Sequence, residues 1–281
     1  MQSYSPLRYP GGKSQISRFI ANIIERNNLV GGSYAEPYAG GAGVALFLLL
    51  HGYMTDIFIN DIDYSIYAFW YSVINNTDEL CKLINDTPVT LDNWAVQKGI
   101  QYNVKNYSLL EVGFSTFFLN RTNRSGILKG GIIGGFQQRG KYKIDCRYNK
   151  VNLIKRIQQI ADRRDFVHVS NLDAIEFLDK FEYKCDLKTL IYFDPPYYNK
   201  GQKLYVNFYT HNDHVQLKEY ISKMNGNWIV TYDDTEAISN LYSEFNKINL
   251  AISYFAAEKR KGAELLFYSP RLSVPHKSVS K

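Results

Sequence analysis

Hydrophobic positions in the first part of the chain alternate between helical spacing and short extended runs. Residues 14–24 place apolar side chains three or four positions apart, which predicts a surface helix packed on a core. Residues 33–36 predict a strand, and the uniformly apolar residues 44–50 predict a buried helix. A second strand at 56–60 and a second helix at 62–74 follow. The chain therefore opens as a βαβα unit, which predicts a parallel sheet.

The same rhythm returns after residue 150. Helical spacing over 151–160 is followed by apolar extended runs at 166–169 and 187–193. Three further strands are predicted at 228–232, 248–255 and 264–268. The pattern predicts an α/β fold with a seven-stranded, mostly parallel sheet and helices on both faces.

The stretch from about residue 75 to residue 150 breaks this rhythm. It holds turn residues and many aromatics, and its part between Arg121 and Arg147 is crowded with Arg, Lys and Gly. We interpret it as an inserted module. The predicted domains are residues 1–70 with 151–281, and the insert 71–150.

Size and composition are those of a folded protein. The 281 residues are 45% hydrophobic and 21% charged, without a long low-complexity tract. No apolar run approaches the ~20 residues that span a bilayer, and the first ten residues lack a signal pattern, so we expect a cytoplasmic protein without a membrane partner. The cysteines Cys81, Cys146 and Cys185 lie far apart, and neither a disulfide framework nor a metal site is expected.

Charge and aromatic content favour a polyanionic partner without proving one. The net charge is +6 and the pI is near 8.9, values that also fit many proteins that never contact nucleic acid. Aromatic residues make up 15% of the chain, including 23 tyrosines, and flat side chains can stack on bases.

The strongest chemical signal is the tetrapeptide Asp194, Pro195, Pro196 and Tyr197, directly after an apolar strand. Open α/β sheets place their ligand crevice at such strand ends. Two prolines supply no N–H, so the Asp194 carboxylate and the Pro195 carbonyl form an acceptor platform for an amino group. Tyr197 is then expected to stack on the base. The alternative is a tight turn in which Asp194 only caps the backbone.

A glycine loop gives the second signal. Residues 36–43 (EPYAGGAG) lie between a predicted strand and a predicted helix, where glycines let a ligand approach the backbone. Asp61 follows about twenty residues later at the tip of the next strand, a position suited to ribose hydroxyls. A solvated strand-end carboxylate is the alternative for Asp61.

These motifs resemble the Dam-type (D12 class) adenine-N(6) DNA methyltransferases in content and order. They are RYPGGK at 8–13, EPYAGGAG at 36–43, NDID at 60–63, and DPPY. The resemblance covers nearly the whole chain. It implies class I (Rossmann-like) methyltransferase architecture, with S-adenosylmethionine as the cofactor. The cofactor-binding residues that it implies are Tyr9, Lys13, Glu36, Tyr38, Gly40, Gly43, Asp61, Asp173 and Asp194.

The resemblance also assigns the insert to target recognition, through a basic hairpin that reads base edges. The candidate DNA contacts are Asn120, Arg121, Arg124, Lys129 and Arg139. Arginine suits guanine because its planar fork bonds bidentately, whereas lysine mostly holds phosphates. The best-known members carry FNGLxRxN and GxFNVPFG here, and this chain has RSGILKGG and IIGGFQQRGKY. No recognition sequence is therefore predicted.

A segment after DPPY resembles the family's stretch that closes over the flipped base. Tyr205, Phe208 and Tyr209 lead into Thr210 to His214. The two histidines of that stretch could suggest a metal, but the start of a surface helix is the preferred interpretation.

The expected function is therefore methyl transfer to adenine in double-stranded DNA, with no metal. Alternatives are a non-catalytic DNA-binding regulator, or methylation of a cytosine amine, RNA or a protein amide. By resemblance, Asp at position 194 favours adenine, since cytosine-amine enzymes usually have Ser there and amide enzymes Asn. A separately encoded restriction endonuclease of matching specificity is a candidate partner that the sequence leaves open.

Overall fold

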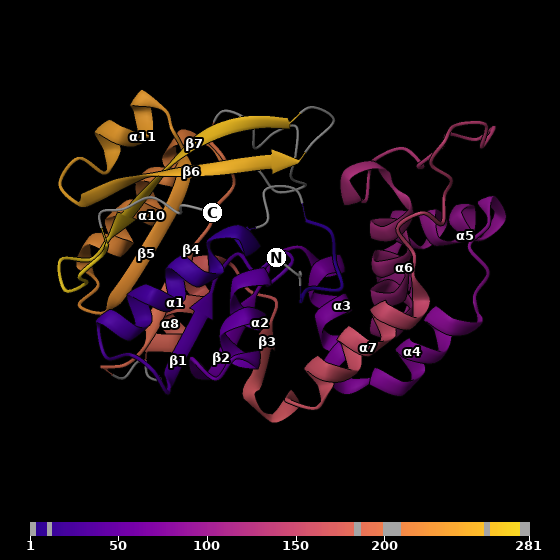
Figure 1. Ribbon diagram of the computed structural model, residues 1–281, viewed down its shortest axis with the longest axis horizontal. Helices are drawn as coiled ribbons and strands as arrows, with labels where there is room; N and C mark the ends of the chain where they lie inside the picture. The colour runs from indigo at the N-terminus through magenta and orange to yellow at the C-terminus, as the bar shows by residue number, and fades with distance from the viewer. Residues whose placement is uncertain (1–3, 10–12, 183–186, 199–208, 256–258, 276–281) are drawn as a thin grey trace.

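The protein has a lobe built on a sheet and a lobe built of helices, which lie side by side (Figure 1). The computed structural model describes residues 4–9, 13–182, 187–198, 209–255 and 259–275. None of the helices within these ranges is long and apolar enough to cross a bilayer.

A seven-stranded sheet forms the first lobe, in the order β3-β2-β1-β4-β5-β7-β6. Its strands are β1 (Gly32–Glu36), β2 (Met54–Asn60), β3 (Val167–Ser170), β4 (Leu190–Phe193), β5 (Asn227–Asp233), β6 (Asn246–Phe255) and β7 (Lys259–Tyr268). The first five strands are parallel, while β7 runs antiparallel to both β5 and β6. The predicted α/β fold with a seven-stranded, mostly parallel sheet is confirmed.

Helices cover both faces of the sheet. One face carries α1 (Ser17–Arg26), α2 (Gly43–Leu50) and α3 (Tyr64–Asn75), and the other carries α8 (Ala174–Glu182), α10 (His211–Lys223) and α11 (Glu236–Leu241). Strand β4 shows why both faces are buried: Leu190 and Tyr192 join the first cluster, and Ile191 and Phe193 join the second. A strand buried on both faces must be apolar throughout, as the sequence of β4 is.

The crossovers fix where a ligand can bind. From β1 the chain crosses through α2 to β2 on one side, while β4 pairs with β1 on the other side. This reversal of direction opens a crevice at the carboxyl ends of the strands. Glu36 ends β1, Asp61 follows β2 and Asp194 follows β4, so the three acidic residues meet at this edge.

The second lobe consists of α4 (Thr77–Asp86), α5 (Leu91–Tyr102), α6 (Leu109–Thr122) and α7 (Lys150–Ala161). Its centre is α6, which begins at a capping box made by Ser108 and Glu111 and is buried from Val112 to its end. At Gly113 a Cβ atom would lie 2.6 Å from the carbonyl oxygen of Ala68, so only glycine lets α6 approach α3 this closely. Short 3-10 turns complete the chain: η1 (Lys13–Ile16), η2 (Val104–Asn106), η3 (Arg124–Gly126) and η4 (Arg164–Phe166).

The predicted insert boundaries fall within or beside helices rather than in linkers. Tyr71 lies inside α3, and Lys150 is the first residue of α7. Both helices pack on α4, and α3 also packs on α6 and β3. The chain therefore enters the helical lobe along a continuous helix, and the two lobes share α3.

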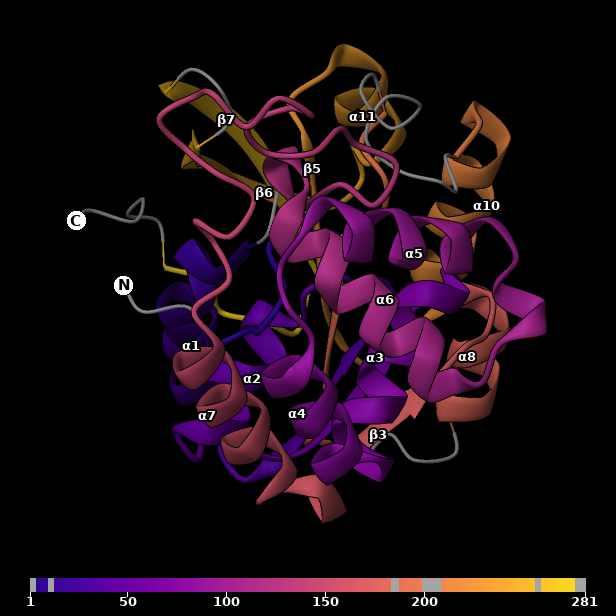
Figure 2. The ribbon, with the colours of Figure 1, turned by 90° about the vertical axis from the view of Figure 1, so that its right-hand side faces the viewer.

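Residues 123–149 form a loop of turns where a basic hairpin was expected. Within these residues the only strand-like pairing is one antiparallel bridge between Asn123 and Ile132. Left-handed backbone interrupts longer pairing, and it occurs at Ser125, Gly126, Gly134, Gly135 and Gln138. Figure 2 shows this loop arching above α6. Its many glycines are the physical reason that no extended ladder forms.

Candidate active site

A cavity of about 280 Å³ opens at the carboxyl ends of β1, β2 and β4. This volume is close to the lower end of the ~300 to 1,000 Å³ common for ligand pockets. Among the residues expected to bind cofactor or substrate, those that line it are Tyr9, Lys13, Glu36, Tyr38, Gly43, Asp61, Asp194 and Pro196. Motifs from distant parts of the sequence therefore share one cavity.

Glu36 holds the start of the glycine loop. Its Oε1 accepts hydrogen bonds from the Tyr34 hydroxyl at 3.0 Å and from the Ala45 N–H, in the first turn of α2, at 3.1 Å. Because this carboxyl is buried without a cation, burial raises the pKa of Glu36 to about 8. Glu36 thus fixes the turn between β1 and α2 at the base of the cavity.

The RYPGGK and EPYAGGAG motifs are in direct contact. Gly40 has a φ of +46°, and a Cβ atom there would lie 2.6 Å from the ring of Tyr9. The carbonyl of Gly40 accepts a hydrogen bond from the Trp70 indole at 2.9 Å. Gly40 is therefore required both for its backbone conformation and for the close packing of Tyr9.

Asp61 ties the glycine loop to the end of β2. Its Oδ2 accepts from the Gly40 N–H and its Oδ1 from the Asp63 N–H, both at 2.9 Å. Burial, followed by the nearby charge of Asp63, raises the pKa of Asp61 to about 7. Between these two acids Ile62 is 48% exposed and lines the cavity. Sequence analysis missed Ile62, which offers an apolar surface beside two carboxylates.

Asp194 at the end of β4 is held by a buried cation and a hydroxyl. Lys13 Nζ lies 2.7 Å from Asp194 Oδ1, and the Thr231 hydroxyl donates to the same oxygen at 2.9 Å. The Lys13 side chain is 3% exposed and the Asp194 side chain 23%. Tyr192 continues the chain of hydroxyls, with 2.8 Å between its oxygen and that of Thr231.

The remaining DPPY residues differ in exposure. Pro195 is buried, whereas Pro196 is half-buried and lines the cavity. Tyr197 is only 5% exposed and lies outside the cavity lining, so its ring is not placed for the expected stacking on a base. The reason is that its hydroxyl points inward, donating to Glu264 Oε1 at 2.8 Å and accepting from Lys13 Nζ at 3.2 Å.

Glu264 and Thr231 are site residues that sequence analysis missed. Glu264 lies on β7 and is fully buried, and Thr231 lies on β5. Thr231 directly follows the apolar run 228–230, and Glu264 directly precedes the apolar run 265–268, and that was the available signal.

Asp173 is not among the residues that line the cavity, but it acts electrostatically on Tyr38, which is, and its contact with the adenine ring of the cofactor stays a prediction. Asp173 is exposed, and its Oδ1 accepts from the Ile175 N–H at 2.9 Å at the start of α8. Its side chain therefore acts as a helix cap. Tyr38 does line the cavity, with its hydroxyl 2.7 Å from that of Tyr209.

Two of the five expected DNA contacts are buried instead. Asn120 Oδ1 accepts from the Arg8 N–H at 2.7 Å, and its Nδ2 donates to the Arg8 carbonyl at 2.7 Å and to the Gly126 carbonyl at 2.9 Å. Arg121 donates to the Pro6 carbonyl, and burial together with the nearby Arg156 lowers the pKa of Arg121 to about 9. Both side chains hold the N-terminal segment, and Arg121 also lines the cavity.

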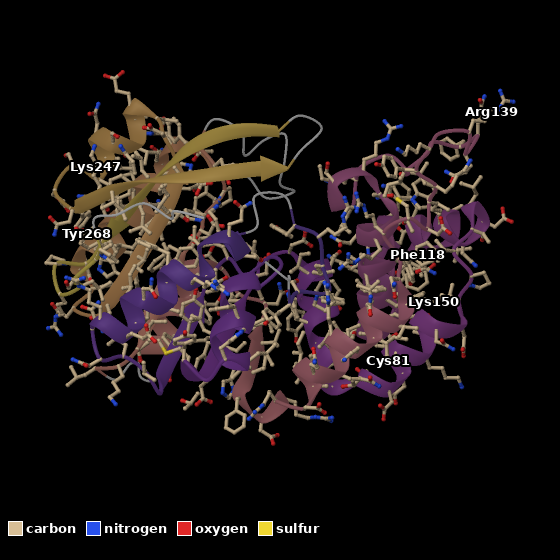
Figure 3. All side chains as sticks on the ribbon, in the orientation of Figure 1. Cys81, Phe118, Arg139, Lys150, Lys247 and Tyr268 are labelled. Atoms are coloured by element: carbon tan, nitrogen blue, oxygen red, sulfur yellow. The ribbon has the colours of Figure 1, made fainter. Side chains whose placement is uncertain are left out.

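Arg124, Lys129 and Arg139 are exposed on the loop over α6. Within the described part of the chain, no ion pair involves any of the three. Figure 3 shows Arg139 at the outer tip of the loop, directed away from the sheet. Two aromatic side chains on the same loop are also exposed, Phe136 at 71% and Tyr142 at 58%.

The two histidines after DPPY do not form a metal site. His211 begins α10, while His214 is buried with its Nδ1 2.8 Å from the Tyr232 hydroxyl. Burial lowers the pKa of His214 to about 4. The described residues contain no cluster of three or more His, Cys, Asp or Glu side chains suited to a metal ion. Tyr205 and Phe208 lie outside the described residues.

Comparison with known families decides the assignment. The D12 class N6 adenine-specific DNA methyltransferase family matches residues 9–252. This protein belongs to that family. The methyl donor of these methyltransferases is S-adenosylmethionine.

Individual relatives are more distant. The chain is 23% identical over 236 residues to the Type II methyltransferase M.MjaIII of Methanocaldococcus jannaschii, covering 78% of this chain and 79% of that one. Two solved structures are similar with a TM-score of 0.40. One is a SAM-dependent methyltransferase from Agrobacterium tumefaciens (9% identity, 89% of this chain, 61% of that chain). The other is described as a class I methyltransferase from Listeria monocytogenes (10%, 99% and 66%). The chain spans less than two thirds of either structure.

Proposed function

We propose that this methyltransferase moves the methyl group of S-adenosylmethionine to the exocyclic amino nitrogen of an adenine rotated out of double-stranded DNA at a specific sequence. The observation that carries the proposal is Asp194, placed at the end of β4 on a cavity that also holds the glycine loop and Asp61. One acceptor group therefore stands beside a pocket suited to a nucleoside.

The residues present fit the cofactor. Two carboxylates at the end of β2 suit ribose hydroxyls, exposed Ile62 offers an apolar face to a ring, and Tyr9 with the glycine loop would enclose the methionine end. When bound, S-adenosylmethionine supplies a methyl carbon that bonds to the amino nitrogen as its bond to sulfur breaks. The sulfur would keep the electron pair of that bond, and the methylated nitrogen would release one proton to solvent.

Asp194 would orient the amino group. Its Oδ1 already receives hydrogen bonds from Lys13 and Thr231, so Oδ2 is the oxygen left for the substrate. Together with the Pro195 carbonyl it would accept both amino hydrogens and aim the nitrogen lone pair at the methyl carbon. Transfer from a sulfonium needs alignment above all, and a fixed acceptor pair supplies it. A base inside a duplex is out of reach, so the adenine must first rotate out, at roughly a few kcal/mol.

Of the five expected DNA contacts, Arg124, Lys129 and Arg139 are the ones whose side chains are exposed. We assign the loop that carries them to target binding, and residues 71–150 to the recognition domain. The enzyme would act in the cytoplasm. A restriction endonuclease of matching specificity is a partner that the name of the Methanocaldococcus relative supports.

The test is long-read sequencing that detects modified bases, on DNA from cells that express the wild-type chain or Asp194→Ala. We expect modified adenine in one sequence context with the wild type and none with Asp194→Ala. Asp179→Ala is the matched control, because Asp179 is exposed on α8 and its contact is the Tyr220 hydroxyl. Modification by Asp194→Ala at the wild-type level would rule out the mechanism, and no modification by the wild type would rule out the function.

A further inference from the structure

A buried polar cluster lies behind Asp194. Of its members, Lys13 lines the cavity, whereas Tyr197 and Glu264 do not. The cluster comprises Lys13, Tyr197 and Glu264, whose exposed fractions are at most 5%. Lys13 Nζ lies 3.4 Å from Glu264 Oε1 and 2.7 Å from Asp194 Oδ1. Tyr197 bridges the other two, accepting from Lys13 and donating to Glu264. With Asp194, these side chains form one connected network of four: Lys13 from η1, Asp194 and Tyr197 from the DPPY turn after β4, and Glu264 from β7.

One lysine contacts two carboxylates in this network. Among the described side chains, Lys13 lies between Asp194 and Glu264. Glu264 is fully buried, whereas the Asp194 side chain is 23% exposed at the cavity, so the reacting groups meet the charge of Asp194.

Methyl transfer is sensitive to such a charge. If the proposed function holds, positive charge is present on sulfur before the reaction and on the amino nitrogen immediately after bond formation. A preorganised negative potential at the reacting atoms stabilises that charge, and in a site with little water the effect is strong.

We propose that Glu264 is a positioning residue for methyl transfer. It holds Lys13 and Tyr197 from behind, and its charge keeps Lys13 from neutralising Asp194. Asp194 thereby remains a strong hydrogen-bond acceptor toward the amino group although it is paired with a lysine. This inference rests on the proposed function and adds a residue of β7 that does not contact substrate.

The direction of the pH dependence follows from the surroundings of Asp194. Burial raises the pKa of Asp194, the Lys13 charge lowers it, and the Glu264 charge raises it. Removing the Glu264 charge should therefore lower the pKa of Asp194, weaken it as an acceptor, and move the acid limb of kcat to lower pH. The other titratable groups that act electrostatically with Asp194 are Tyr34, Glu36 and Tyr192.

The decisive experiment compares the pH profiles of wild type and Glu264→Gln between pH 5 and 9. Gln keeps an oxygen that can accept from the Tyr197 hydroxyl but has no charge. We expect kcat at pH 8 to fall by at least about tenfold, the KM for DNA to stay unchanged, and the acid limb to move to lower pH. A merely structural role for Glu264 would lower thermal stability without moving the acid limb.

Glu244→Gln is the matched control, since Glu244 pairs with Lys218 at the surface and is 51% exposed. It should leave kcat and the pH profile as they are in the wild type. If Glu264→Gln does not fold, Glu264→Asp decides, because it keeps the charge but withdraws it by one methylene group; a lower kcat is then expected. The inference would be overturned if the folded Glu264→Gln variant kept the wild-type kcat and acid limb. If Glu264→Gln does not fold, the same result with Glu264→Asp would overturn it. Failure of the proposed function is distinguishable, because then the wild type itself makes no methyladenine.

Discussion

The two lobes differ in the exposure and pairing of their basic side chains. In the sheet lobe, Lys13 is 3% exposed and lies within 3.4 Å of two carboxylates. On the helical lobe, Arg124, Lys129 and Arg139 are exposed, and the described residues offer them no ion pair. A buried, paired cation fixes the geometry of its partners, whereas an exposed, unpaired cation is available to a polyanion. The comparison therefore separates a charge that fixes the site geometry from charges that a polyanion can reach.

The N-terminal segment joins the two lobes. Its residues Pro6 and Arg8 are held by Arg121 and Asn120 of α6, and Arg156 of α7 donates to the Ser5 carbonyl at 3.2 Å. Further along the chain, Lys13 reaches Asp194. The helices α6 and α7 of the helical lobe and Asp194 at the end of β4 thus hold the same short stretch of chain. Arg121 shows that a basic residue in the helical lobe can also be structural.

Replacing the paired cation should have the largest effect. Lys13→Gln removes the cation that lies between the Asp194 and Glu264 carboxylates. Because Lys13 lowers the pKa of Asp194, its loss raises that pKa, so a larger fraction of the acceptor is protonated at a given pH and activity falls. Breaking a buried pair also lowers the free energy of unfolding by about 3 to 5 kcal/mol. Methylation assays from pH 6 to 9 and urea denaturation measure the two effects.

The exposed Lys129→Gln serves as the matched control and should leave the free energy of unfolding unchanged. If Lys13→Gln retained wild-type kcat and stability at pH 7, the contrast between paired and unpaired cations would have no functional meaning. Recovery of part of the activity at high pH is the expected signature, because deprotonation then restores the acceptor.

The strand-end acids could be predicted because the information is local in sequence. An apolar run followed by Asp marks both Asp61 and Asp194, and parallel strands bring such ends to one edge. The contact between Lys13 and Glu264 could not be predicted, since it joins opposite ends of the chain across β5 and β7. Periodicity gives the order of elements along the chain but not the pairing of a mixed sheet.

The helical lobe was harder to predict for another reason. Basic residues are expected at the surface, so Arg121 gave no sign of its burial against the Pro6 carbonyl. The glycine-rich stretch suggested a hairpin, but its left-handed residues, such as Gly134 and Gly135, produce turns instead. Composition predicted what this lobe contains, and only the structure shows which charges remain exposed.

Neutralising one exposed cation should have an intermediate effect. Arg124→Gln, Lys129→Gln and Arg139→Gln should each weaken DNA binding without changing thermal stability. A side chain that contacts a phosphate reduces the slope of log K against log salt by about 0.9, whereas one that reads a base contributes about 1 to 3 kcal/mol of discrimination. Fluorescence anisotropy titrations at several salt concentrations distinguish the two roles.

Arg163→Gln controls for net charge, because Arg163 is exposed between α7 and β3. In Figure 1 the connection between α7 and β3 lies on the lower side of the molecule, away from the loop above α6. It should leave the salt slope as it is in the wild type. An equal loss of affinity in Arg163→Gln would mean that overall charge, and not this loop, binds DNA.

Asp61 is intermediate between the buried, paired Lys13 and the exposed cations of the loop. It is partly buried, and its described partners are the N–H groups of Gly40 and Asp63. Burial raises its pKa to about 7, and ribose hydroxyls would donate to its ionised form, so ligand binding should release protons. We expect the affinity for S-adenosylhomocysteine to fall by up to about tenfold per pH unit below pH 7. Calorimetry at pH 6 and 8 measures this small effect. Asp61→Asn should bind S-adenosylhomocysteine weakly and lose the pH dependence. If Asp61→Asn kept the same pH dependence, another group would be its source. Glu36 is then the candidate, because its pKa of about 8 is close to that of Asp61.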